Sequence, residues 1–115
     1  MKIITLLIPA YLPRAHPGAT PTPFPSSLID KLEFELVKLS RTILRGPNAV
    51  KLTENVRFVG QEIVTPYTFA ASGDMDVLNA VSLVLKTLSL KTLLILSEDG
   101  PIVFGLDELG EVIIL

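Results

Sequence analysis

The chain has 115 residues, of which 49% are hydrophobic and 19% charged, and its formal net charge at pH 7 is −2. A chain of this length is expected to fold as one domain, residues 1–115, around one core. Its slightly acidic balance argues against nucleic-acid binding, which usually needs a basic face. With no cysteine and a single histidine, His16, the chain lacks the usual ligand sets for zinc. We therefore expect no metal ion and no cofactor.

The first segment, residues 2–9, is almost entirely apolar, which is typical of a strand covered on both faces. A signal peptide is the alternative, but Pro9 interrupts the apolar run and only Lys2 precedes it as a basic residue. No stretch approaches the ~20 apolar residues of a membrane-spanning helix. The sequence thus predicts a soluble, cytoplasmic protein without a membrane segment.

Residues 12–25 are predicted to form a proline-rich loop. Five of the nine prolines fall within residues 13–25, and their spacing contains no P-x-x-P repeat. Because proline fixes φ and lacks an N–H donor, a stiff surface loop is favoured over a ligand for an SH3-type domain. His16 lies in this loop, either as an ordinary exposed residue or as a substrate contact.

The first helix is predicted over residues 27–45. Ser27 fits its N-cap, and Gly46–Pro47 supply residues that commonly end a helix. Apolar residues recur at helical spacing along it and form one stripe. The predicted buried stripe consists of Leu28, Ile29, Leu32, Leu36, Leu39 and Ile43.

Beyond residue 49 the apolar period changes to two, which predicts a hairpin of strands 49–59 and 62–71. Gly60–Gln61 is the predicted turn. Pro66 falls inside the second strand, where proline is expected only at an edge or at a bulge.

A second helix is predicted to begin at Asp74, which fits the N-cap position. Its buried stripe consists of Val77, Leu78, Val81, Val84, Leu85 and Leu88.

The carboxyl-terminal part is predicted to contain three strands. The segment 91–96 is followed by an Asp99–Gly100 turn and by a return strand at 102–104. A further turn at 107–110 leads into the last strand, 112–115.

The order of elements is strand, helix, strand, strand, helix, strand, with two short strands at the end. This order resembles the ferredoxin-like β-α-β-β-α-β arrangement, in which two helices cover one face of an antiparallel sheet. The resemblance implies an α+β fold with a short carboxyl-terminal β extension.

Few residues stand out as catalytic candidates. The seven glycines form no phosphate-binding loop. Glu54 falls on the apolar face of its strand, where burial would raise its pKa; the alternative is a bulge or turn that leaves it solvated. Glu54, Tyr67 and His16 are the candidates if the chain is an enzyme.

Three arginines could bind an anion, since guanidinium groups match carboxylate and phosphate in bidentate geometry. On the predicted helix Arg41 and Arg45 are one turn apart, and Arg57 follows on the next strand. A solvated helix face explains the first two equally well.

The sequence favours a non-catalytic binding or regulatory module that self-associates, with a small molecule or a protein as a further partner. The alternative is a small enzyme with a pocket between sheet and helices that uses Glu54, Tyr67 or His16. Residues 111–115 end in four consecutive apolar residues, and an edge strand of this kind is a template for pairing. We therefore expect a homo-oligomer, most simply a dimer, through this strand.

Overall fold

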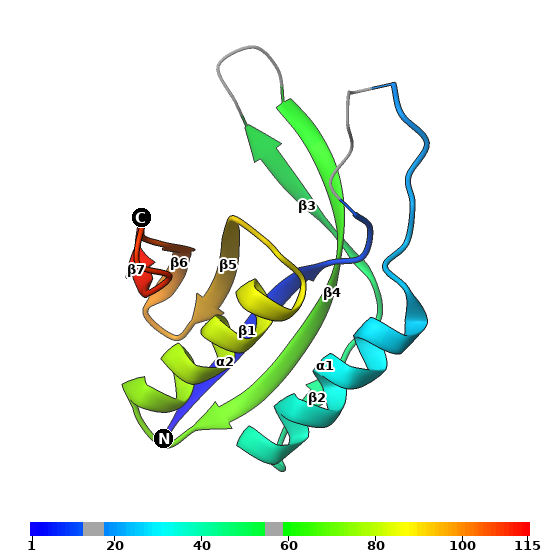
Figure 1. Cartoon of the computed structure of the whole chain (residues 1–115). Helices are drawn as coiled ribbons and strands as arrows, with labels where there is room; N and C mark the ends of the chain where they lie inside the picture. Colours follow the sequence, from blue (N-terminus) through cyan, green and yellow to red (C-terminus); the bar gives the residue numbers. More distant parts are fainter. Residues whose placement is uncertain (13–17, 55–58) are drawn as a thin grey trace.

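The computed structural model describes residues 1–12, 18–54 and 59–115, and the side chains of these residues except those of 52–54 and 59–61. Within these ranges the fold is α+β, with two helices on one face of a seven-stranded antiparallel sheet (Figure 1). The elements are β1 (Lys2–Pro9), α1 (Ser26–Leu39), β2 (Leu44–Arg45), β3 (Ala49–Glu54), β4 (Val59–Ala71), α2 (Asp74–Thr87), β5 (Thr92–Ser97), β6 (Gly100–Leu106) and β7 (Val112–Ile114).

The strands lie in the order β2-β4-β1-β5-β6-β7, and β3 also pairs with β4. The predicted α+β class is confirmed. The predicted ferredoxin-like arrangement is not confirmed. That arrangement has a four-stranded sheet, whereas β2, β6 and β7 give this sheet a different strand order. No helix within the described ranges is long and apolar enough to cross a membrane.

Both helices pack on the same side of the sheet, as their apolar stripes predicted. Leu36 of α1 and Val81 of α2 belong to one buried cluster with alternate residues of the central strands, such as Leu6 and Ile95. The two helices contact each other, and α2 also contacts β1, β4, β5, β6 and β7. The sheet therefore curves around α2 (Figure 1).

Strand β1 is covered on one face only, so the prediction of a strand buried on both faces is wrong. Ile4, Leu6 and Ile8 face the helices and are buried, whereas Ile3 is 49% exposed. No described helix covers the opposite face of the sheet, where Leu96 and Val103 are also exposed. The apolar side chains of β1 thus alternate between the buried core and the uncovered face of the sheet.

Helix α1 ends at Leu39, earlier than predicted. Ser40 adopts an extended conformation (φ −150°, ψ 119°), and its hydroxyl hydrogen-bonds the Thr42 hydroxyl at 2.7 Å. The chain then enters β2, where Leu44 pairs with Thr68 of β4. Pairing of Leu44 and Arg45 with β4 thus takes the place of the last turn of the predicted helix.

The caps of both helices also differ from the prediction. Pro25 precedes α1, which has no side-chain cap, so Ser27 is not the N-cap residue. At α2 the Asp76 carboxylate accepts a hydrogen bond from the Ser72 amide at 2.9 Å. Asp74, the predicted cap, instead lies 4.0 Å from the Lys2 ammonium.

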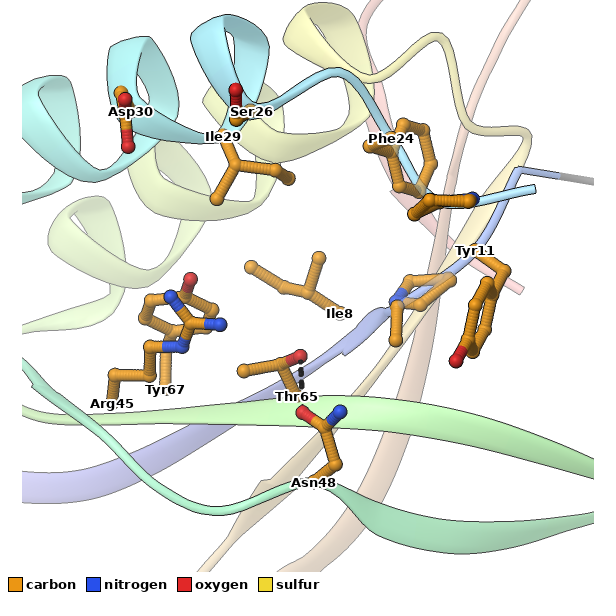
Figure 2. Close-up of a pocket in the computed structure, with 13 residues that line it drawn as sticks. Ile8, Tyr11, Phe24, Ser26, Ile29, Asp30, Arg45, Asn48, Thr65 and Tyr67 are labelled. Atoms are coloured by element: carbon orange, nitrogen blue, oxygen red, sulfur yellow. Dashed lines mark hydrogen bonds between the residues drawn. The ribbon is translucent and has the colours of Figure 1, made fainter.

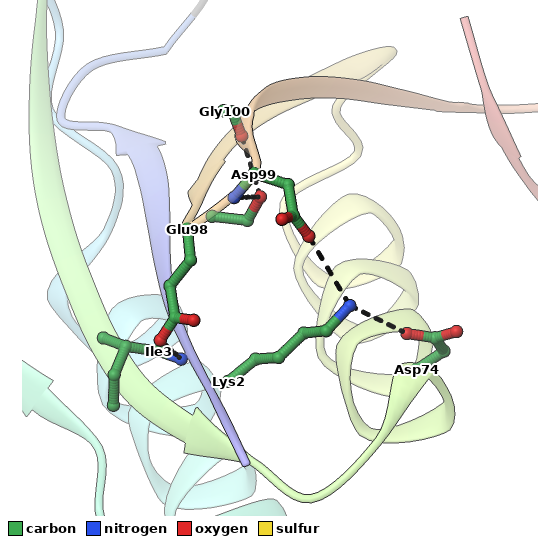
Figure 3. A network of polar contacts seen from close by, with 7 residues as sticks. Lys2, Ile3, Asp74, Glu98, Asp99 and Gly100 are labelled. Carbon is green, nitrogen blue, oxygen red and sulfur yellow. Dashed lines mark hydrogen bonds and ion pairs between the residues drawn. The ribbon is translucent and has the colours of Figure 1, made fainter.

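Lys2 links the start of β1 to two other parts of the chain. Its ammonium lies 3.7 Å from the Asp99 carboxylate in the β5–β6 turn, in addition to its contact with Asp74 (Figure 3). In the same turn Glu98 accepts a hydrogen bond from the Ile3 amide. These contacts are exposed and contribute little stability individually, but they show that the amino-terminal end of β1, the start of α2 and this turn are neighbours.

The predicted hairpin is present as β3 and β4, with a different turn. Gly60 pairs with Thr53 and Gln61 with Leu52, so the predicted Gly60–Gln61 turn is wrong, and both residues lie within β4. The connection between the strands comprises residues 55–58, which lie outside the described residues.

Pro66 lies within β4 opposite a bulge. Three residues, 46–48, connect β2 to β3, and they lie opposite only two residues of β4, Thr65 and Pro66. The Gly46 amide donates to the Pro66 carbonyl at 2.8 Å, but no reciprocal bond can form because proline has no N–H. The interruption of the neighbouring strand is what allows a proline inside the sheet.

Strand β7 lies at the end of the sheet. It pairs with β6 through Phe104–Ile114 and Leu106–Val112, and the Leu115 amide donates to the Val103 carbonyl at 2.9 Å. The edge position predicted for the last strand is confirmed.

Candidate functional site

A cleft of about 320 Å³ lies between the start of α1 and the sheet (Figure 2). We call it the α1 cleft. Its apolar lining comprises Ile8, Pro9, Ala10, Tyr11, Pro23, Phe24 and Ile29. Its polar lining comprises Ser26, Asp30, Arg45, Asn48, Thr65 and Tyr67.

The bulge opposite Pro66 places part of the polar lining. Arg45 is the last residue of β2, and Asn48 is the last residue before β3. The hydroxyl of Thr65, which is buried on β4, donates to Asn48 Oδ1 at 2.9 Å. With its oxygen engaged in this way, the Asn48 amide directs its N–H₂ group away from Thr65 (Figure 2).

A three-residue polar contact forms one side of the cleft. The Tyr67 hydroxyl donates to Glu33 Oε1 at 2.5 Å, and Arg45 Nη1 donates to the same oxygen at 2.9 Å. Glu33 lies on α1, Arg45 on β2 and Tyr67 on β4, so the contact joins the helix to the sheet. Glu33 does not line the cleft itself, but it orients two of the groups that do.

The state of Tyr67 limits the chemistry of the site. Burial raises the pKa of the Tyr67 hydroxyl well above its usual value, and the hydrogen bond to Glu33 and its negative charge add to this, against the lowering effect of Arg45. Tyr67 is therefore a neutral hydrogen-bond donor at physiological pH and not a general base. The arrangement is suited to holding a ligand.

No protein-family model, curated protein or solved structure matches this chain. The interpretation of the α1 cleft therefore depends on its own residues.

The structure brings two of the predicted site residues together, Tyr67 and Arg45. Arg41 is exposed and does not line the cleft; because α1 ends before it, Arg41 and Arg45 do not share a helical turn. Glu54 ends β3, but its side chain lies outside the described part of the structure, as do residues 16 and 57. Catalytic roles for Glu54 and His16, and anion binding with Arg57, remain predictions.

Glu33, Asp30, Asn48 and Thr65 were not predicted as site residues. Glu33 had a detectable signal, since it follows Ile29 by four residues and precedes Leu36 by three. At helical spacing this places a carboxylate on the border of the buried stripe, where it can reach a partner on the sheet. Asn48 and Thr65 had no such signal, because they are brought together by a bulge, whose position depends on strand pairing and not on a periodic pattern in the sequence.

A second hollow, of about 730 Å³, lies beyond Tyr11, which lines both spaces. Leu12 and Pro21 border it, on either side of the undescribed residues 13–17. We take the α1 cleft as the candidate site because the contact of Glu33, Arg45 and Tyr67 fixes one side of it. Among the described residues, no group of three acidic or histidine side chains is placed to hold a metal ion.

Proposed function

We propose that this chain is a small non-catalytic binding module that forms a homodimer through β7. The observation that carries the proposal is that β7 is an edge strand of the sheet with exposed apolar side chains, Ile113, Ile114 and Leu115. An unprotected edge of this kind readily pairs with another strand.

The backbone of β7 has groups available for such pairing. Since Leu115 hydrogen-bonds Val103, and bonded and non-bonded residues alternate in an antiparallel ladder, Ile113 also bonds β6. The N–H and C=O groups of Val112 and Ile114 therefore point away from β6. A second β7 strand related by a two-fold axis at Ile113 would place Val112 opposite the partner's Ile114 and satisfy both.

The opposite edge of the sheet also exposes apolar side chains, Leu44 and Val50, but it carries protective features that β7 does not have. It comprises the two-residue strand β2, the bulge containing Pro47, and β3, whose Lys51 pairs with Glu62 at 3.1 Å. Short strands, proline and charge are the usual means of preventing strand pairing. The contrast favours β7 as the assembly edge.

The open face of the sheet supports association as well. Ile3, Leu44, Leu96 and Val103 are exposed on the side away from the helices. Soluble monomers rarely expose large contiguous apolar patches. Pairing of two β7 strands would join the two open faces into one surface, available to a further partner.

We also propose that β3, β4, β1 and β5, with the two helices, form a ferredoxin-like core to which β2, β6 and β7 are additions. Supporting this, the four strands are neighbours in that order and every pairing among them is antiparallel. On this basis deletion of 111–115 should leave the circular dichroism spectrum close to that of wild type.

A proline substitution tests the dimer sharply. Light scattering after size exclusion should give the wild type twice the 12.5 kDa mass of one chain at tens of micromolar. Ile114→Pro removes an N–H group that points away from β6, so two β7 strands can no longer pair fully and the variant should be a monomer. Strand β7 should stay in its own sheet, because the bonds of Ile113 and Leu115 to β6 remain. Ile114→Val, which keeps the N–H, should remain dimeric. A monomeric wild type, or a dimeric Ile114→Pro variant, would refute the proposal.

A further inference from the structure

The charged groups around the α1 cleft carry more negative than positive charge, which disfavours a simple anion as the ligand. Arg45 lines the cleft, and its Nη1 contacts Glu33, but a guanidinium has five N–H donors, so this contact engages only part of them. Asp30 lines the same cleft from α1. Two carboxylates, of Asp30 and Glu33, therefore accompany one guanidinium.

This charge balance selects among ligands. A simple anion could reach Arg45 but would enter a site that already has an excess of negative charge. A simple cation could pair with Asp30 but would make no use of Arg45, whose side chain is 55% exposed and whose remaining donors are hydrated. A ligand that carries both charges satisfies each group and leaves the net charge of the site unchanged.

Asn48 adds a second donor for a carboxylate. Its Oδ1 accepts the Thr65 hydroxyl, which leaves the amide N–H₂ group as its available function. Arg45 and Asn48 flank the bulge, and Figure 2 shows both side chains extending from the sheet side of the cleft. Asp30 approaches from the helix side.

The remaining lining is apolar and suits a compact body. Ile8 and Ile29 face each other across the cleft, and Phe24 lies on the side away from Arg45 (Figure 2). The volume of about 320 Å³ is at the lower end of the range for small-molecule pockets, roughly 300–1,000 Å³. The ligand must therefore be small, with an apolar part beside a polar head.

We propose that the α1 cleft binds a small zwitterion with an apolar body, of which a free apolar α-amino acid is the simplest example. Its carboxylate binds Arg45 and the Asn48 amide, its ammonium group binds Asp30, and its side chain packs against Phe24 and Ile8. This site gives a ligand class to the proposed binding module and does not require the β7 dimer.

Three compounds that share a phenyl ring test the charge requirement. Wild-type protein is titrated with L-phenylalanine, 3-phenylpropionate and 2-phenylethylamine, and amide shifts are followed by NMR. We expect phenylalanine to bind with a Kd between about 10 μM and 1 mM, as for a compact ligand in a small open site. The other two compounds should bind at least about tenfold more weakly, since each lacks one charge. Equal binding of either one, or no response to 10 mM phenylalanine (about −2.7 kcal/mol or weaker), would overturn the proposal.

The variant Asp30→Asn separates the two charges without altering size. It should weaken the binding of phenylalanine about tenfold, because the ammonium group of the ligand loses its partner. It should not weaken the binding of 3-phenylpropionate, because the carboxylate of that ligand is no longer repelled by Asp30. Glu108→Gln is the matched control, an exposed carboxylate in the β6–β7 turn, and should bind both compounds as wild type does. Unchanged phenylalanine binding in Asp30→Asn would contradict the assignment. The Ile114→Pro variant should bind phenylalanine normally, so failure of the dimer and failure of the ligand site are distinguishable.

Discussion

The Tyr67 hydroxyl and the Glu33 carboxylate are joined by a 2.5 Å hydrogen bond that links β4 to α1. The same Glu33 oxygen also accepts a hydrogen bond from Arg45. One carboxylate oxygen is therefore bonded to both a buried phenol and a partly exposed guanidinium. The contact fixes one side of the α1 cleft, and its loss should affect both stability and the shape of the site.

Tyr67→Phe should destabilise the protein by about 1–3 kcal/mol, as expected for loss of a hydrogen bond to a charged group. The phenylalanine ring fills the same buried space, so the change reports the hydroxyl. Denaturant unfolding gives the measurement. Tyr11→Phe, at the other end of the cleft, is the control and should change the free energy of unfolding by less than about 0.5 kcal/mol. Equal effects would mean that the Glu33 contact contributes no stability.

The same hydrogen bond predicts a pH dependence at alkaline pH. The pKa of Tyr67 is raised in the folded state above the ~10 of an unfolded tyrosine, chiefly by burial. Folding therefore favours the protonated phenol, and this contribution is complete below about pH 10 and is lost as the pH rises further. The stability difference between wild type and Tyr67→Phe should be constant from pH 7 to 9 and should shrink above about pH 10. A constant difference up to pH 11 would contradict this.

Two leucines of α1 should respond very differently to the same substitution. Leu36 is 1% exposed and Leu39 is 44% exposed. Leu36→Ala should cost ~2–5 kcal/mol through lost burial and the cavity it leaves. Leu39→Ala should cost less than about 1 kcal/mol, because much of its side chain remains in water. Similar denaturation midpoints for the two variants would mean that the buried face of α1 is assigned incorrectly.

Gly46→Ala should disturb the bulge beside the cleft. A Cβ on Gly46 would lie 2.9 Å from Pro66 Cγ, and the proline ring can move little within β4. We expect a loss of about 1–3 kcal/mol, typical of overpacking. Gly73→Ser is the control, since a side chain there meets nothing within 4 Å, φ is −169°, and serine is also favoured at this N-cap position of α2. If the two variants melt at the same temperature, the close approach of Gly46 to Pro66 is not a constraint.

The sequence by itself determined most of the buried residues of the two helices, although Leu39 and Leu78 of the predicted stripes are exposed. Leu32 and Leu36 in α1, and Val81 and Leu85 in α2, were identified from helical spacing and belong to the core. This succeeds because the period of an element is a local property, and one apolar face must be covered. The pairing of two successive strands as a hairpin also followed from a local pattern, although its turn was placed wrongly.

Only the tertiary structure decided where α1 ends and what its end contacts. Helical spacing extended the predicted helix to Arg45, but Leu44 and Arg45 pair with β4 and form a strand instead. Likewise the sequence left Pro66 at an edge or at a bulge, and the structure places it opposite the bulge at 46–48. Glu33 and Tyr67 are 34 residues apart, and Glu33 and Arg45 are 12 apart. Their meeting depends on how the helix packs on the sheet, because contacts between distant residues arise from packing and leave no periodic signal in the chain.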